Sequence, residues 1–208
     1  MNAGEIKRLG MKVWGGQNGL LSLAELDLLM RIIREYKGED PRVLEVGHYY
    51  GLSTCGIVHA LRDRGDDWSM LTLDAHCADS WVGETDPEDF HRNRRDFFDD
   101  PRLDVVIARS ETLTEALPYH VVFYDGDHAH EQLRFTRLVI DSPMTRLFVF
   151  DDRDFGTPKQ CCKELVAEGW VDESPTLQRL GGDKRNVDTM TLGVFRREKY
   201  ATSEGCTS

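Results

Sequence analysis

The chain has 208 residues, a formal net charge of −11 at pH 7 and an isoelectric point near 5.1. This charge disfavours nucleic acid as the main partner, because binding a phosphate backbone needs clustered Lys and Arg. No run of about eighteen apolar residues occurs, so we expect no membrane partner and no signal peptide, and we predict a cytoplasmic protein. The five cysteines lack CxxC spacing, which indicates neither a disulfide framework nor a thiolate zinc site.

Strand and helix signals alternate along the chain, which predicts an α/β fold with a largely parallel sheet and helices on both faces. A capping box formed by Ser22 and Glu25 should begin a helix that runs to about Lys37. Apolar runs predict five strands, and a further helix is expected between the first two, at 53–63. The five strands are predicted at 43–46, 70–73, 103–108, 121–124 and 147–150.

The second half of the chain is expected to add a polar helix over 87–98 and a helix capped by Thr157, with Pro158 at its first position and Gly169 at its end. Residues 170–194 are expected to form two strands around a turn at 181–183. We predict one domain, with a helical segment at 1–40, a core at 41–196 and a flexible tail at 197–208.

Residues 43–61 combine a buried strand, a glycine turn and a helix, which is where an α/β sheet binds a nucleotide. The turn has the pattern ExGxxxG, formed by Glu45, Gly47 and Gly51. A pyrophosphate favours bare backbone amides without a neighbouring carboxylate, so Glu45 indicates a ligand that carries positive charge.

Asp74 follows the next strand, where a carboxylate can accept hydrogen bonds from both hydroxyls of an adenosine ribose. Sites for NAD and for S-adenosylmethionine share this feature. Glu45 and the missing third glycine favour the cofactor that carries a cationic amino acid.

Acidic residues also follow the two later strands of the predicted sheet. If these strands are neighbours, Asp125, Asp151 and Asp152 lie close together and raise one another's pKa. A bound divalent cation would relieve this repulsion, and oxygen ligands suit Mg²⁺. The alternative is that Asp152 caps a turn while Asp151 points into solvent.

A histidine is the candidate general base. His128 lies three residues after Asp125, and an imidazole titrates near neutral pH. A histidine in the first turn of a helix is also a common surface residue. The competing candidates are His48, His76 and His130.

Five motifs give the chain a resemblance to the class I S-adenosylmethionine-dependent methyltransferases over about residues 20–195. The resemblance is greatest to small O-methyltransferases of the catechol O-methyltransferase type and to bacterial natural-product and sugar O-methyltransferases. VLEVGHYYGLST resembles their cofactor loop, LTLDA the ribose-binding strand end and VIARSET the adenine turn, while FYDGDH and FVFDD resemble the two metal-bearing strand ends.

This resemblance implies a Rossmann-like, doubly wound sheet of seven strands in a three-layer α/β/α arrangement, with the last strand antiparallel. It implies methyl transfer from S-adenosylmethionine, assisted by Mg²⁺, to the hydroxyl of a small molecule or sugar. His128 lies where the catechol enzymes have a lysine base. The implied cofactor residues are Glu45, Gly47, Tyr49, Gly51, Ser53, Asp74, Ala75, Ser110, Glu111 and Asp125, and the implied metal ligands are Asp125, Asp151 and Asp152.

Two other functions compete with this interpretation. One is an NAD-dependent oxidoreductase, which the ExGxxxG spacing disfavours, and the other is a non-catalytic protein that binds S-adenosylmethionine. A protein without catalytic function has no need for three clustered carboxylates, which argues against the non-catalytic alternative. The methyl acceptor cannot be read from Trp14, Trp81 or Phe155, and whether the chain forms a homo-oligomer is left open.

Overall fold

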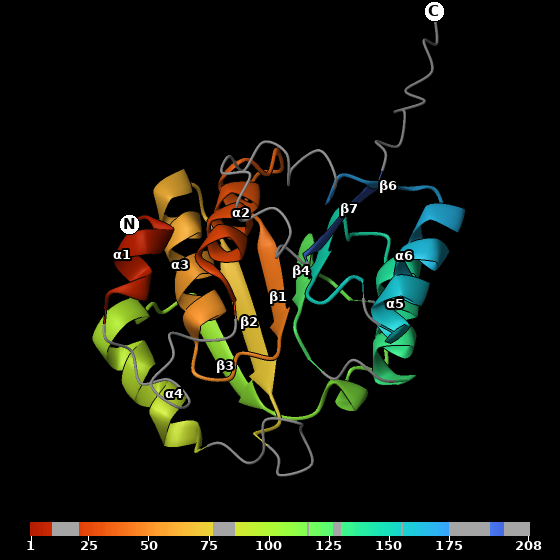
Figure 1. Cartoon of the computed structure of the whole chain (residues 1–208). Coiled ribbons are helices and arrows are strands. Elements are labelled where there is room, and N and C mark those ends of the chain that lie inside the picture. Colours follow the sequence, from red (N-terminus) through yellow and green to blue (C-terminus); the bar gives the residue numbers. More distant parts are fainter. Residues whose placement is uncertain are drawn as a thin grey trace, which may run out of the picture.

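The structure is a computed structural model that describes residues 1–9, 21–76, 86–115, 117–126, 130–154, 156–174 and 192–197. Its centre is a seven-stranded sheet with helices on both faces (Figure 1). The strand order is β3-β2-β1-β4-β5-β7-β6. The strands are β1 (Arg42–Val46), β2 (Ser69–Asp74), β3 (Leu103–Ile107), β4 (Val121–Tyr124), β5 (Leu147–Phe150), β6 (Trp170–Asp172) and β7 (Gly193–Arg197).

Strands β1 to β5 pair in parallel, and β7 pairs antiparallel with both β5 and β6. The predicted doubly wound sheet with an antiparallel last strand is therefore confirmed. The two strands expected within 170–194 pair with each other, although β7 lies at the end of that range and extends beyond it. Their predicted turn at 181–183 lies outside the described residues.

The helices surround the sheet as the alternating pattern predicts. Two of the eight helical segments in the described part of the chain are not α-helical: one is a π-helical turn and one is a 3₁₀ turn. No helix in the described part of the chain is long and apolar enough to span a bilayer. The segments are α1 (Ala3–Lys7), α2 (Leu23–Arg34), α3 (Leu52–Arg64), α4 (Pro87–Asn93) with the π-helical η2 (Arg94–Phe98), the 3₁₀ turn η3 (Ser110–Thr112), α5 (His130–Asp141) and α6 (Gly156–Ala167).

The sheet separates two apolar cores, because successive side chains of a strand point to opposite faces. In β1, Val43 packs into the core beneath α1, α2 and α3, whereas Leu44 packs into the core beneath α5 and α6 (Figure 1). Both side chains have no exposed surface. The central strands are thus buried on both faces, which explains their continuous apolar runs.

Three helix boundaries differ from the prediction. The predicted cap at Thr157 is wrong, since α6 already begins at Gly156 and Pro158 lies within its first turn. The segment at 87–98 is not one regular helix, because α4 passes into a π-helical turn at Arg94. Helix α2 ends at Arg34 and not near Lys37. Local capping signals therefore identified these helices but not all of their ends.

Candidate functional site

The turn between β1 and α3 brings the ends of three strands together. Gly47 has φ +86°, and its N–H donates a hydrogen bond of 2.8 Å to the carbonyl of Leu73 on β2. A Cβ at Gly47 would lie 2.1 Å from the carbonyl oxygen of Asp125, which follows β4. Both the positive φ and the close backbone contact require glycine at this position.

Gly51 is the N-cap residue of α3 and has the left-handed conformation, with φ +90°. A Cβ there would lie 2.8 Å from the ring of Phe98 and 3.0 Å from that of Phe90. Ser53 follows within the first turn of α3 and is buried. The two predicted glycines thus allow the tight turn between β1 and α3, and Gly51 also leaves room for the rings of Phe90 and Phe98.

Glu45 is completely buried in β1, facing α3. The hydroxyls of Thr54 and Thr72 each donate a hydrogen bond of 2.6 Å to its Oε2 atom. Its Oε1 atom is buried and has no hydrogen-bond partner in the described part of the chain. Burial raises the pKa of Glu45 to about 7. A buried carboxylate with one unpaired oxygen is costly, and a ligand that donates a hydrogen bond to it would remove that cost.

Asp74 connects the end of β2 to the glycine turn. Its Oδ2 atom accepts a hydrogen bond of 2.7 Å from the N–H of Tyr49, and its Oδ1 atom accepts one of 2.8 Å from the N–H of His76. Burial acts to raise the pKa of Asp74, but the nearby His48 and these two amides outweigh it, so the pKa lies below its ordinary value. Asp74 is therefore a carboxylate that the turn itself orients.

A small cavity lies at this turn. Its lining includes four of the predicted cofactor residues: Gly47, Tyr49, Ser53 and Asp125. Its volume is about 40 Å³, which is room for a few water molecules. The cavity therefore lies where the residues of the glycine turn meet Asp125.

The residues expected near the adenine lie after β3. Ser110 is half-buried in η3, where its hydroxyl donates to Glu131 of α5 at 3.2 Å. Glu111 is exposed, and Ala75 is half-buried directly after Asp74. The structure therefore places these three residues near strand ends.

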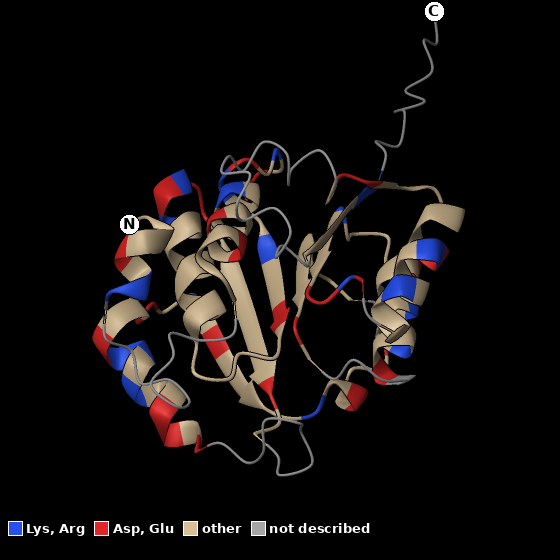
Figure 2. Cartoon of the chain, in the orientation of Figure 1, with Lys and Arg blue, Asp and Glu red and all other residues tan. Residues whose placement is uncertain are grey.

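The acidic residues after β4 and β5 lie at neighbouring strand ends, as the sequence predicts. The N–H of Asp151 donates to the carbonyl of Tyr124 at 3.1 Å, and the N–H of Asp152 donates to Oδ1 of Asp151 at 2.9 Å. Burial, followed by the charges of Asp151, Glu45 and Asp152, raises the pKa of Asp125 well above its ordinary value. In Figure 2, acidic segments lie on the central strands, whereas Lys and Arg are frequent on the outer helices.

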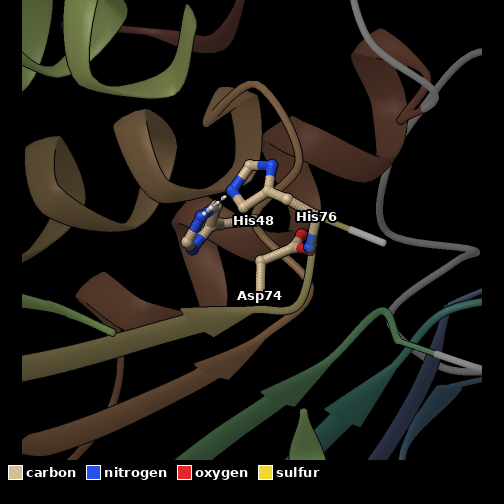
Figure 3. Close-up of side chains that lie close together, drawn as sticks. All are labelled: His48, Asp74 and His76. Atoms are coloured by element: carbon tan, nitrogen blue, oxygen red, sulfur yellow. Dashed lines mark hydrogen bonds between the residues drawn. The ribbon is translucent and has the colours of Figure 1, made fainter. Parts of the chain in front are cut away.

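A different cluster has the closer ligand geometry. Among the described residues, one group of His, Cys, Asp and Glu side chains has three potential ligand atoms within 4.8 Å of one another, and its members are His48, Asp74 and His76 (Figure 3). Asp125, Asp151 and Asp152 do not form such a group. From the sequence alone, His48 and His76 are only alternative bases, because their proximity depends on β1 and β2 being neighbours.

The two histidines of this cluster belong to a buried chain of hydrogen bonds. Nε2 of His48 lies 2.8 Å from Nε2 of His76, and Nδ1 of His48 lies 3.0 Å from the hydroxyl of Thr72. The ring of His48 also stacks on Phe90, with 3.9 Å between the ring centroids. Burial lowers the pKa of His48 to about 3, so its imidazole is neutral at pH 7.

Several candidates fall outside the described residues. They include the predicted base, His128, and the side chain of His130, although α5 begins at His130. The prediction for the base therefore stays a prediction. The aromatic residues Trp14, Trp81 and Phe155 also lie outside the described part of the chain.

Comparison with known proteins identifies the class of the fold. The chain has the fold of class I methyltransferases, which three solved structures share at low sequence identity. A Podospora anserina methyltransferase bound to S-adenosylhomocysteine is 13% identical, with a TM-score of 0.59, and the match covers 95% of this chain and 88% of that one. A Klebsiella pneumoniae protein provisionally described as an O-methyltransferase is 16% identical, with a TM-score of 0.52 and coverage of 94% and 88%. A ribosomal protein L11 methylase from Lactobacillus delbrueckii subsp. bulgaricus is 11% identical, with a TM-score of 0.52 and coverage of 86% and 81%.

A family model described as a methyltransferase domain matches residues 44–143, which contain the glycine turn and Asp74. This match and the fold together support an S-adenosylmethionine-dependent methyltransferase of class I. No curated protein matches the chain.

Proposed function

We propose that this methyltransferase transfers a methyl group to an oxygen atom of a small molecule or a sugar. The observation that carries the proposal is the junction of β1, β2 and β4. There Glu45 lies near the end of the strand before the glycine turn, Asp74 accepts a hydrogen bond from the N–H of Tyr49 in the turn, and Asp125 lines the same cavity as Gly47. The resemblance to O-methyltransferases supports oxygen as the methyl acceptor. The alternative of an NAD-dependent oxidoreductase has no comparable support.

The residues of the turn fit a cofactor with a cationic amino acid at one end and a ribose near its middle. We propose that Glu45 pairs with the ammonium group, since its buried Oε1 atom lacks a partner in the described residues. Asp74 would hold the ribose hydroxyls, because among the described residues each of its carboxylate oxygens accepts one backbone amide and retains a lone pair. Tyr49 and the two glycines would surround the methionine part, while Ser110 and Glu111 would border the adenine.

The chemistry places two demands on the chain. S-adenosylmethionine supplies an electrophilic methyl group whose leaving group is a neutral thioether, so no general acid is needed. The protein must hold the acceptor oxygen at attack distance, and such positioning is worth about 7–11 kcal/mol in favourable cases. It must also receive the acceptor's proton, and we propose His128 for this role.

Magnesium assistance is the narrower part of the proposal, with Asp125, Asp151 and Asp152 as ligands. The crowding of negative charge around Asp125 supports it, because a cation would relieve that repulsion. The three carboxylates do not lie within 4.8 Å of one another, so an ion would have to draw them together. We therefore assign no step of the reaction to the metal.

Calorimetric titration with S-adenosylhomocysteine and, separately, with NAD tests the cofactor assignment of this site. We expect saturable binding of S-adenosylhomocysteine alone, and binding of NAD alone would overturn the proposal. Formation of S-adenosylhomocysteine from S-adenosylmethionine, assayed with panels of catechols and glycosides, then tests O-methyl transfer. Cofactor binding without turnover on either panel would favour the non-catalytic alternative.

Magnesium dependence needs a separate test. Asp151→Ala should abolish turnover that depends on Mg²⁺ while leaving cofactor binding largely unchanged. Full turnover by the native chain in EDTA would contradict a role for the metal. A cytoplasmic location and the absence of a nucleic-acid or membrane partner stay predictions.

A further inference from the structure

We propose that His48, Asp74 and His76 form a binding site for one divalent transition-metal ion of the zinc type, separate from the three carboxylates after β4 and β5. The ligand atoms of these three residues lie within 4.8 Å of one another at the carboxyl ends of β1 and β2 (Figure 3). Two histidines and one carboxylate are a common ligand set for such ions. The site does not depend on which acceptor the enzyme methylates.

The two imidazoles are placed so that one ion can bind both. Their Nε2 atoms face each other at 2.8 Å, with both side chains buried. Two nitrogen ligands of a tetrahedral zinc ion, each about 2.05 Å from the metal, lie about 3.3 Å apart. An opening of about 0.5 Å, with a rotation of the rings that directs both Nε2 lone pairs at the ion, would therefore admit it.

The neighbouring hydrogen bonds determine which nitrogen of His48 is available. Thr72 donates its hydroxyl hydrogen to Glu45 at 2.6 Å, so its oxygen can only accept from Nδ1 of His48, at 3.0 Å. His48 must then carry its hydrogen on Nδ1, which leaves a lone pair on Nε2. A second shell that holds the distal N–H of a histidine is typical of metal ligands.

The other two ligands are also oriented before any ion binds. Asp74 is held by the backbone amides of Tyr49 and His76. Without a metal, the hydrogen on Nε2 of His76 satisfies the lone pair of His48. When the ion binds, that hydrogen moves to Nδ1 of His76, and both rings stay neutral.

The ligand set also selects the class of ion. Imidazole nitrogen favours Zn²⁺, Co²⁺, Ni²⁺ and Cu²⁺, whereas Mg²⁺ requires oxygen ligands and keeps several waters. Three protein ligands leave at least one coordination position for water or another ligand. Because Asp74 is also the proposed ribose partner, the site is tested without cofactor.

Co²⁺ titration of the full chain, stripped of metal with EDTA and dialysed, tests the site directly. We expect one equivalent of Co²⁺ to bind with visible d–d absorption bands of a four- or five-coordinate ion. Stoichiometric Zn²⁺ should remove these bands, and millimolar Mg²⁺ should not. His76→Gln should weaken Co²⁺ binding at least tenfold.

Two control variants test whether Co²⁺ binds at this cluster and not at another site. His59→Gln alters a half-buried histidine outside the cluster, whose Nε2 bonds to the carbonyl of Phe97, and Asp151→Asn alters the other candidate site. Both should bind Co²⁺ as the native chain does. Circular dichroism melting checks that each variant folds, and Asp74→Asn replaces His76→Gln if the latter does not.

Three results would overturn the proposal. The first is the absence of spectroscopically visible Co²⁺ binding by the native chain at micromolar concentrations. The second is equal binding by the native chain and His76→Gln, which would place the ion elsewhere. The third is binding that Asp151→Asn abolishes, which would assign the ion to the carboxylates after β4 and β5.

Discussion

The backbone N–H of Tyr49 donates a hydrogen bond of 2.7 Å to Oδ2 of Asp74, across 25 positions of sequence. This contact joins the turn after β1 to the end of β2. Tyr49 has φ +47°, a left-handed conformation that is uncommon for a residue other than glycine and that costs free energy. The carboxylate of Asp74 therefore helps to maintain the turn in addition to its proposed contact with the ribose.

Asp74→Asn should weaken both functions of this side chain. The amide nitrogen of asparagine cannot accept a hydrogen bond, so one of the two backbone N–H groups loses its partner, at a cost of about 1–3 kcal/mol in the free energy of unfolding. We also expect at least tenfold weaker binding of S-adenosylhomocysteine. Urea unfolding and calorimetry measure the two effects. The control is Asp104→Asn, at an exposed position of β3. An Asp74→Asn variant that binds S-adenosylhomocysteine as tightly as the native chain would contradict the ribose assignment.

Gly47→Ala should be severely destabilising, because the new Cβ would lie 2.1 Å from the carbonyl oxygen of Asp125. Gly65→Ala is the matched control. Gly65 also has positive φ, +76°, but nothing lies within 4 Å of its Cβ position. We expect Gly65→Ala to lower the free energy of unfolding by about 1 kcal/mol, because of the backbone conformation alone. Gly47→Ala should lower it by about 2–4 kcal/mol more, because the new Cβ overlaps the carbonyl oxygen. Equal losses in urea unfolding would show that close packing at the turn is unimportant.

Glu45→Gln should change how stability depends on pH. The pKa of Glu45 is about 7 in the folded chain, against an ordinary value of 4.5, so the folded state retains a proton that the unfolded state releases. The stabilisation from this protonated group is complete below pH 4.5 and is lost as the pH rises through 7. The native chain should therefore lose about 3 kcal/mol over this range from Glu45 alone.

Glutamine retains an oxygen acceptor for Thr54 and Thr72 but does not titrate. The difference in unfolding free energy between native chain and variant, measured at several pH values from 4 to 8, isolates this contribution. Parallel curves would contradict the raised pKa. Binding of S-adenosylhomocysteine should nevertheless weaken in Glu45→Gln, because the ammonium group loses its proposed charge partner.

Ser22→Ala should destabilise the start of α2 by about 1 kcal/mol. The hydroxyl of Ser22 accepts from the N–H of Glu25 at 3.2 Å, and the carboxylate of Glu25 accepts from the N–H of Ser22 at 2.8 Å. Ser22→Thr keeps the hydroxyl and should retain most of the stability. Thermal and urea unfolding compare the two variants. An unaffected Ser22→Ala variant would show that α2 is stabilised by packing alone.

Much of the fold could be predicted because it depends on local pattern. The predicted strands at 121–124 and 147–150 agree residue for residue with β4 and β5, since both are short apolar runs buried on both faces. The capping box identified the start of α2 in the same way. The sequence does not predict the start of α6 or the π-helical turn after α4, because packing against the rest of the protein determines such boundaries.

The sequence by itself determined the class of fold and the position of the glycine turn after β1. Both can be read from neighbouring residues, the first from alternating strand and helix signals and the second from the ExGxxxG motif. Tertiary structure alone decided which distant side chains meet. It paired Tyr49 with Asp74 and His48 with His76, because β1 and β2 lie side by side in register. It also left the carboxylates of Asp125, Asp151 and Asp152 further apart than their strand order suggests, since adjacent strand ends do not determine the direction of each side chain.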